Sequence, residues 1–239
     1  MWPLARVIRV RTTLLDLVLP ITCPGCGTAE RWCARCAAPL GARPRRLPSA
    51  LADMQSAPPV YALAAYDGPV RAVVIAAKEH GRRDLPTLLG VVLGRALLRL
   101  LAIQVLSGPL WLVPAPTRRA TARRRGGDPI TVMARAAATV LAASGRPSGV
   151  APCLSTAGRA RDSVGLDPAQ RVANLAGRLR WHERAGPPPS RGVILIDDVF
   201  TTGATAQSAA TMLAAAGHTV QSVVTLAAAT RWFPAAPPR

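Results

Sequence analysis

The chain has 239 residues, enough to bury a hydrophobic core, and half of them are apolar although only 4% are aromatic. This composition excludes a disordered protein and favours helices packed closely against a sheet. The formal net charge of +18 favours phosphate-bearing ligands, nucleic acid or anionic surfaces, while a solubilising basic surface or arginine-rich codon usage would give the same charge.

The N-terminal apolar run, residues 14–21, does not have the features of a secretory signal. It is short, contains an aspartate, and leads into a cysteine pair instead of a cleavage site of small residues. The longest apolar region, residues 88–113, is interrupted by Arg95 and Arg99. We therefore expect a buried helix followed by a strand at 88–113, no membrane span, and a cytoplasmic location.

Four of the five cysteines form two C-x-x-C motifs that place four thiolates around one tetrahedral Zn²⁺. The glycines at 25 and 27 favour the tight backbone turns that such a site needs, and the short spacing between the motifs leaves room only for a minimal hairpin. A thioredoxin-like redox pair or two disulfides are the alternatives, but the first needs a single motif and the second an oxidising compartment. The predicted ligands of this structural zinc are Cys23, Cys26, Cys33 and Cys36.

A proline- and arginine-rich stretch, residues 39–59, follows the cysteine motifs and is typical of a linker. We therefore predict an N-terminal helix and zinc module at 1–45, a linker at 46–59 and an α/β domain at 60–239.

Strands and helices are expected to alternate through the α/β domain. Apolar runs predict strands at 60–66, 111–113, 149–154, 192–197 and 220–228, with helices at 69–78, 85–106, 129–144, 168–179 and 204–216. Asp128 before Pro129 and Gly145 or Gly217 after an apolar run are helix start and stop signals. The alternation predicts a mostly parallel sheet that helices cover on both faces.

Residues 193–205 read Val-Ile-Leu-Ile-Asp-Asp-Val-Phe-Thr-Thr-Gly-Ala-Thr: a buried strand, two acids, and a loop of small residues before a helix. Ligands of open α/β sheets lie beyond the carboxyl ends of strands, so Asp197, Asp198 and the loop should face one crevice. The amides of residues 201–205 would bind a phosphate at the helix start, and the acids would hold the vicinal hydroxyls of a ribose, directly or through Mg²⁺. A helix cap and an ordinary turn are the alternatives.

This segment resembles the signature of type I phosphoribosyltransferases. With the cysteine motifs, the whole chain resembles the ComF family of competence-associated, phosphoribosyltransferase-like proteins. Further similar segments are residues 15–27, 66–71 with Lys78, 112–116, 124–126 and 170–174. The resemblance implies a type I phosphoribosyltransferase-like fold with a small N-terminal zinc module.

The resemblance also implies roles for individual residues. Asp197 and Asp198 would be the catalytic acids that bind the ribose hydroxyls. The 5-phosphate would be bound by Thr201, Thr202, Gly203, Ala204 and Thr205. The loop after the strand at 111–113, with Arg118 and Arg119, would face the pyrophosphate beside Mg²⁺, and Lys78 either approaches the pyrophosphate or is a solvated surface lysine.

The implied reaction is transfer of a phosphoribosyl group from 5-phosphoribosyl diphosphate, with displacement of pyrophosphate at the anomeric carbon. The chain reads Arg-Gly-Gly-Asp-Pro at 125–129 where the family usually has R-G-F-N-Q, and no nucleobase-recognition element can be identified. The alternative is a non-catalytic scaffold or sensor that binds single-stranded DNA beside a helicase partner during DNA uptake. The sequence names neither the acceptor base nor the oligomeric state.

Overall fold

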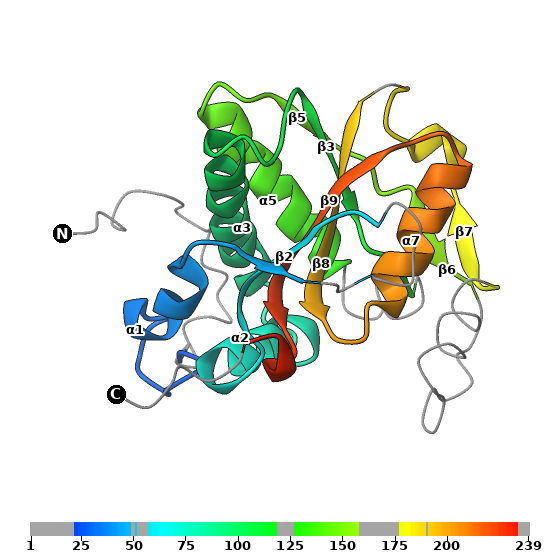
Figure 1. Cartoon of the computed structure of the whole chain (residues 1–239). Helices are drawn as coiled ribbons and strands as arrows, with labels where there is room; N and C mark the ends of the chain where they lie inside the picture. Colours follow the sequence, from blue (N-terminus) through cyan, green and yellow to red (C-terminus); the bar gives the residue numbers. More distant parts are fainter. Residues whose placement is uncertain are drawn as a thin grey trace.

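The computed structural model describes residues 22–48, 51, 57–118, 127–157, 177–189 and 191–233 (Figure 1). In this part of the chain, six strands form a main sheet with the order β1-β2-β9-β8-β3-β5. The neighbours from β2 to β5 are all parallel, whereas β1 pairs with β2 in the antiparallel direction. The predicted α/β class with a mostly parallel sheet is therefore confirmed.

The main sheet contains β1 (Arg45–Leu47), β2 (Val60–Ala65), β3 (Leu110–Pro114), β5 (Ser148–Val150), β8 (Gly192–Phe200) and β9 (Val220–Ala228). A smaller sheet with the order β4-β6-β7 contains β4 (Thr117–Arg118), β6 (Leu154–Thr156) and β7 (Leu179–Trp181). The α-helices are α1 (Ala34–Ala37), α2 (Gly68–Lys78), α3 (Leu85–Ala102), α5 (Pro129–Ala143) and α7 (Ala204–Ala215). Short 3-10 helices are η2 (Ala38–Gly41), η3 (Glu183–Ala185) and η4 (Thr230–Trp232).

Helices cover both faces of the main sheet. Helices α2, α3 and α5 pack on one face, and α7 packs with the smaller sheet on the other (Figure 1). Strand β8 has side chains in both cores, because Ile194 and Ile196 pack on the α3 side while Val193 and Leu195 pack on the α7 side. A strand buried on both faces requires consecutive apolar residues, and residues 193–196 supply them.

Two glycines allow α3 and α5 to approach closely. A Cβ atom at Gly90 would lie 2.4 Å from the carbonyl oxygen of Met133, and one at Gly94 would lie 2.7 Å from Cβ of Val140. Residues four positions apart share one side of a helix, so both glycines face α5. The contact between the two helices therefore depends on the absence of side chains at these positions.

Helix α3 is also, within the described ranges, the one helix whose length and hydropathy would suffice to cross a membrane. Half of this 18-residue stretch is buried in the protein, where it packs against α5 and the main sheet. The prediction of a buried helix followed by a strand at 88–113 therefore matches the packing, although the helix ends at Ala102 and not near residue 106.

The predicted caps of α5 are confirmed. The Asp128 carboxylate accepts hydrogen bonds from the amides of Ile130 and Thr131, both at 3.2 Å, and Pro129 opens the helix. The residue after the helix, Ser144, is followed by Gly145 in the left-handed region at φ 71°. The predictions for β2, α2, α7 and β9 also agree with the structure within one residue at each end.

Other expectations were wrong in their boundaries. The strand predicted at 192–197 continues to Phe200, so the two acids lie inside the strand and not after it. The strand predicted at 149–154 is two strands in different sheets, β5 and β6. At the border between the predicted zinc module (1–45) and linker (46–59), residues 45–47 form the edge strand β1, and Leu47 is buried against the α7-side core. Most of the helix predicted at 168–179 lies outside the described residues, but Leu179 begins strand β7.

Candidate functional site

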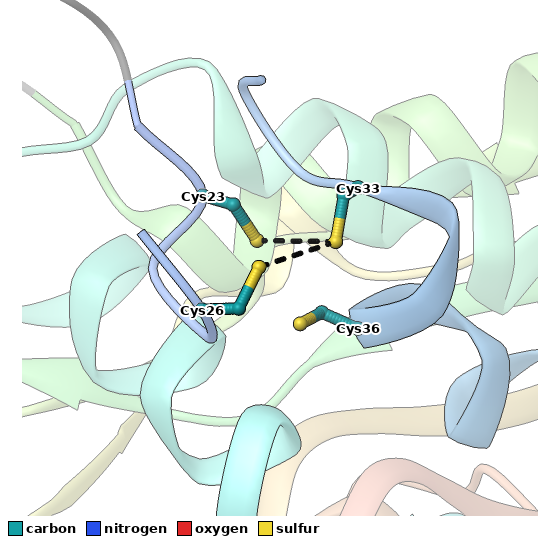
Figure 2. A group of neighbouring side chains, drawn as sticks. All are labelled: Cys23, Cys26, Cys33 and Cys36. Carbon is teal, nitrogen blue, oxygen red and sulfur yellow. Dashed lines mark hydrogen bonds between the residues drawn. The ribbon is translucent and has the colours of Figure 1, made fainter. Parts of the chain in front are cut away.

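The sulfur atoms of the two C-x-x-C motifs converge on one point, as Figure 2 shows. The four atoms all lie within 4.8 Å of one another. The Cys33 sulfur lies 3.7 Å from that of Cys23 and 3.5 Å from that of Cys26. Four sulfurs placed about 2.3 Å from a central Zn²⁺ would be separated by about 3.8 Å, so this cluster can hold such an ion. Four thiolate ligands would leave no position for a substrate, which is consistent with structural zinc.

The two glycines of the first motif have different roles. Gly27 adopts a left-handed φ of 77°, and its amide donates to the Cys23 carbonyl at 2.8 Å, so it makes the turn that the sequence predicts. Gly25 does not have a positive φ. It is required for space instead, because a Cβ atom there would lie 2.7 Å from the Cys36 sulfur and 3.0 Å from Cβ of Pro69 in α2.

The surroundings of the cluster shift the pKa values of two of its thiols in opposite directions. Burial, followed by the neighbouring Cys33 thiol, raises the pKa of Cys36 well above its ordinary value. The side chain and backbone of Thr28 lower the pKa of Cys26. A bound divalent cation would favour the thiolate form of all four cysteines, and its binding would release protons.

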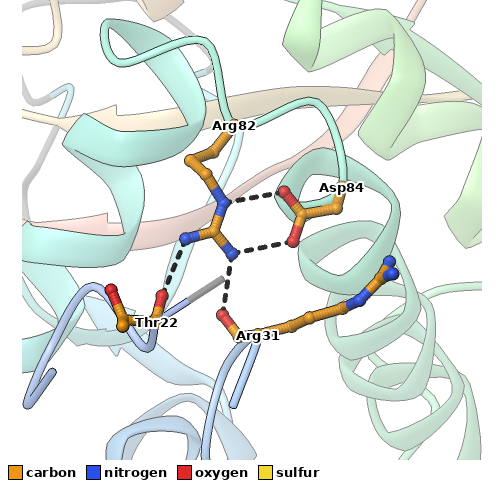
Figure 3. Close-up of polar contacts among 4 residues, drawn as sticks. All are labelled: Thr22, Arg31, Arg82 and Asp84. Atoms are coloured by element: carbon orange, nitrogen blue, oxygen red, sulfur yellow. Dashed lines mark hydrogen bonds and ion pairs between the residues drawn. The ribbon is translucent and has the colours of Figure 1, made fainter. Parts of the chain in front are cut away.

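Arg82 attaches the cysteine motifs to the helical layer (Figure 3). Its guanidinium donates to both carboxylate oxygens of Asp84, at 2.9 and 2.8 Å, and to the carbonyls of Thr22 at 2.8 Å and Arg31 at 3.0 Å. Burial alone would raise the pKa of the Asp84 carboxyl, but the hydrogen bonds and charge of Arg82 hold it below its usual value. The connection between α2 and α3 is thereby joined to the chain on both sides of the first motif.

A second arginine contact lies near the other end of α3. Arg99 donates to the carbonyls of Gly41 at 2.7 Å and Ala42 at 2.9 Å. Trp32 packs against both the cysteine cluster and the core on the α3 side. The segment that carries the cysteines is therefore docked on α2 and α3 at several points.

The two acids of β8 lie near its carboxyl end, where α2 brings a lysine to them. The Nζ atom of Lys78 lies 2.8 Å from Oδ2 of Asp198, whose side chain is only 8% exposed. The other carboxylate oxygen of Asp198 accepts from the amide of Val199 at 2.8 Å, and Oδ1 of Asp197 accepts from the amide of Asp198 at 2.8 Å. Lys78 is therefore paired with an acid and is not simply a solvated surface lysine.

Asp197 lies in an environment that disfavours its charge. Burial first, and then the charge of Asp198, raise the pKa of Asp197 to about 8, although Lys78 acts in the opposite direction. A carboxyl whose pKa is raised by folding stays protonated in the folded protein at pH values where the unfolded chain ionises it, and this difference costs folding free energy. The cost begins above the ordinary carboxyl pKa of about 4 and grows as pH rises toward 8.

The variant Asp197→Asn is therefore expected to stabilise the protein at pH 8 by several degrees in melting temperature, with a gain that vanishes toward pH 4. Thermal unfolding between pH 4 and pH 9 measures this difference. Asp84→Asn is the matched control, because the pKa of Asp84 is lowered and its stabilisation is lost as pH falls. This control should destabilise the protein at pH 8, and a gain for Asp197→Asn that does not depend on pH would contradict the assignment.

The loop after β8 leads into α7 through Gly203, which is buried and adopts a left-handed φ of 85°. The N-cap residue of α7 is Gly203, which has no side chain to accept from the amides of the first turn. The Thr202 hydroxyl oxygen accepts from the amide of Ala204 at 3.5 Å. The start of a helix presents backbone amides and a positive dipole end, which suit an anion.

The start of this loop is held by residues that the sequence did not predict. Arg231 and the indole Nε1 of Trp232 both donate to the carbonyl of Thr201, the indole at 3.5 Å. The Trp232 ring packs edge-on against Phe200 at 6.0 Å, and the Arg231 guanidinium lies over the same indole at 5.5 Å. Both residues belong to η4, which directly follows β9. The sequence offered one indication that the residues after β9 would lie near this loop: parallel neighbouring strands such as β8 and β9 end at the same edge of the sheet.

Of the two arginines predicted to lie beside the pyrophosphate, only Arg118 falls within the described residues. The backbone of Arg118 belongs to β4 and pairs with Thr156 of β6 in the smaller sheet. Arg119 lies outside the described residues, so its role beside the pyrophosphate stays a prediction. Residues 158–176 lie outside them as well.

No protein-family model matches this chain, and a search of curated proteins finds no match. The functional assignment therefore depends on the residues and the geometry described above.

Proposed function

We propose that this protein is a phosphoribosyltransferase-like protein of the ComF type that binds 5-phosphoribosyl diphosphate, or a related ribose phosphate, at the carboxyl end of β8. One observation carries the proposal. A strand buried on both faces carries an acid pair near its carboxyl end, and the left-handed Gly203 then leads into the start of α7 without adding a capping side chain. An anion site and a diol-binding pair of acids are thus separated by one short loop.

Each part of this arrangement suits one part of a ribose 5-phosphate. The first-turn amides of α7 would bind the phosphate, with the hydroxyls of Thr201, Thr202 and Thr205 as further donors. The carboxyl groups of Asp197 and Asp198 would form hydrogen bonds with the vicinal hydroxyls of the ribose. With the diphosphate as ligand, Mg²⁺ would supply positive charge at the pyrophosphate, beside Arg118 and Arg119.

As an enzyme, the protein would transfer the phosphoribosyl group to a nucleophile. The bond between the anomeric carbon and the pyrophosphate oxygen breaks with both electrons leaving on pyrophosphate, and the nucleophile forms the new bond to that carbon. The residues of β8 and α7 would orient the ribose and its phosphate, and Asp197 or Asp198 would stabilise the positive charge that develops on the ring.

Gly203→Ala is expected to weaken binding of ribose 5-phosphate at least tenfold, measured by isothermal titration calorimetry. A side chain at φ 85° is strained, and the loop would have to move away from the phosphate position. Gly217→Ala is the matched control, because Gly217 closes the other end of α7 at φ 81° and carries similar strain. Equal loss of affinity in both variants would mean that the substitutions weaken binding by destabilising the protein and not by changing the phosphate site.

A second candidate function is the scaffold or sensor that binds single-stranded DNA and a helicase partner, and the net charge of +18 favours it. Pyrophosphate release from 5-phosphoribosyl diphosphate, with Mg²⁺ and each nucleobase in turn, separates the two. Turnover that Asp198→Asn abolishes would exclude the scaffold. Absence of turnover, together with single-strand binding that weakens steeply with salt, would exclude the enzyme.

A further inference from the structure

Lys78 is the only lysine in a chain with 30 lysine and arginine residues. It is the last residue of α2, and its ammonium contacts Asp198 of β8 at 2.8 Å. An ammonium is a compact charge with three donors, whereas a guanidinium is a broad planar fork. The one place where the described chain uses the compact cation is therefore beside the acid pair.

The charge of Lys78 is held in place by its surroundings. Burial would lower the pKa of Lys78, but the charge of Asp198, its hydrogen bond and the charge of Asp197 outweigh burial and raise it. Lys78 therefore stays protonated at neutral pH and faces two acids. Its side chain is 42% exposed, so part of the side chain remains accessible from solvent.

The contacts leave capacity for a ligand. One carboxylate oxygen of Asp198 contacts Lys78 and the other accepts from the amide of Val199, and an oxygen of this kind can accept more than one hydrogen bond. The ammonium has donors beyond the one directed at Asp198. A hydroxyl could therefore bind to both groups without displacing either of them.

We infer that the Lys78 ammonium occupies the position at the acid pair that a divalent cation would otherwise take, so that a ribose phosphate binds there with no metal ion between its hydroxyls and Asp198. The identity of the ligand in this inference rests on the proposed function. The occupation of the cation position by Lys78 does not, and it is tested separately.

The first test measures Mn²⁺ binding to the zinc-loaded protein by electron paramagnetic resonance. Wild type and Lys78→Arg, which both keep a cation, are expected to bind no stoichiometric Mn²⁺ at the acid pair. Lys78→Met should gain one Mn²⁺ site, at least tenfold tighter than any wild-type binding, and Asp198→Asn added to Lys78→Met should remove it. Tight binding to wild type, or no gain in Lys78→Met, would overturn the inference.

Circular dichroism and thermal unfolding establish that each variant is folded. If Lys78→Met does not fold, Lys78→Gln takes its place in the same assay, because it keeps a hydrogen-bond donor for Asp198 and removes the charge. The expected gain of a Mn²⁺ site is the same for both variants.

The second test measures ribose 5-phosphate binding by calorimetry in buffer freed of divalent cations by a chelating resin. Wild type should bind, whereas Lys78→Met should bind at least tenfold more weakly and recover when Mg²⁺ is added. A wild-type protein that binds only with Mg²⁺ would overturn the inference about Lys78. Absence of binding under all conditions would refute the proposed function, and the Mn²⁺ result would still decide the role of Lys78.

Discussion

Replacing Cys33 with serine is expected to abolish stoichiometric zinc binding and to lower the melting temperature by about 10 °C or more. Cys33 is the central member of the cluster, since its sulfur lies within 3.7 Å of those of both Cys23 and Cys26. Serine does not provide the soft thiolate that this site offers to zinc. Structural zinc contributes directly to the free energy of folding, so loss of one ligand should lower the stability of the folded protein.

The effect should extend beyond the cluster because the cysteine segment is docked on the helices. Trp32 joins the cluster to the α3-side core, and Arg82 and Arg99 bind backbone carbonyls of the same segment. If the metal leaves, these contacts must hold a loop that has lost its cross-link. We therefore expect a chelator strong enough to remove the metal from the wild-type protein to lower its melting temperature toward that of Cys33→Ser.

Zinc content of the purified protein, measured by mass spectrometry of the metal, and thermal unfolding together check this prediction. The control is Cys153→Ala, because Cys153 is fully buried beside β6 and lies outside the cluster. It should lose stability through a small cavity and keep its zinc. A Cys33→Ser protein with wild-type melting temperature and metal content would show that the cluster does not hold a structural metal.

Gly90→Ala is expected to destabilise the protein by about 2 kcal/mol, although alanine is the better helix former by about 1 kcal/mol. The reason is the contact with α5, where the new Cβ would lie 2.4 Å from the Met133 carbonyl oxygen and 2.9 Å from its Cα. Since these are backbone atoms, no rotamer change can relieve the clash, and the two helices must separate.

Urea unfolding of three glycine variants checks the prediction, because their losses in free energy of unfolding should follow a definite order. Gly94→Ala should lose less than Gly90→Ala, because its shortest contacts are longer, 2.7 Å to Cβ of Val140 and 2.9 Å to the carbonyl oxygen of Ala137. Gly41→Ala should lose little or nothing, because no atom lies within 4 Å of its added Cβ. A stabilised Gly90→Ala protein would mean that α3 and α5 are farther apart than described.

Sequence reasoning succeeded where structure is decided locally. Helix α5 was predictable because Asp128, Pro129 and Gly145 act within one turn of the helix ends. Strand β9 and the buried part of β8 were predictable because a strand enclosed on both faces needs uninterrupted apolar residues. The cysteine cluster was predictable for a similar reason, since two C-x-x-C motifs supply four ligands over a short stretch of chain.

It failed where the partner lies far away in the chain. Nothing near Lys78 indicates that it will pair with Asp198, and nothing near Arg82 indicates that its hydrogen bonds will reach Thr22. Strand β1 was missed because arginine and proline around it resemble a linker, and its pairing with β2 comes from tertiary contact. In the candidate site, therefore, the acids, the loop and Lys78 were named from the sequence, whereas the pairing of Lys78 with Asp198 and the contact of Arg231 with the loop were not predicted.

The short outer strands of the main sheet have a further consequence for how copies of this protein meet one another. An open sheet edge can recruit a strand from a second molecule and begin aggregation. One edge here is β1, only three residues long with Arg45 and Arg46 exposed. The other edge is β5, also three residues long, with the Trp111 ring packed against Gly149. Edge strands that are this short, and that are charged or covered, should disfavour the pairing of strands between the sheets of neighbouring molecules.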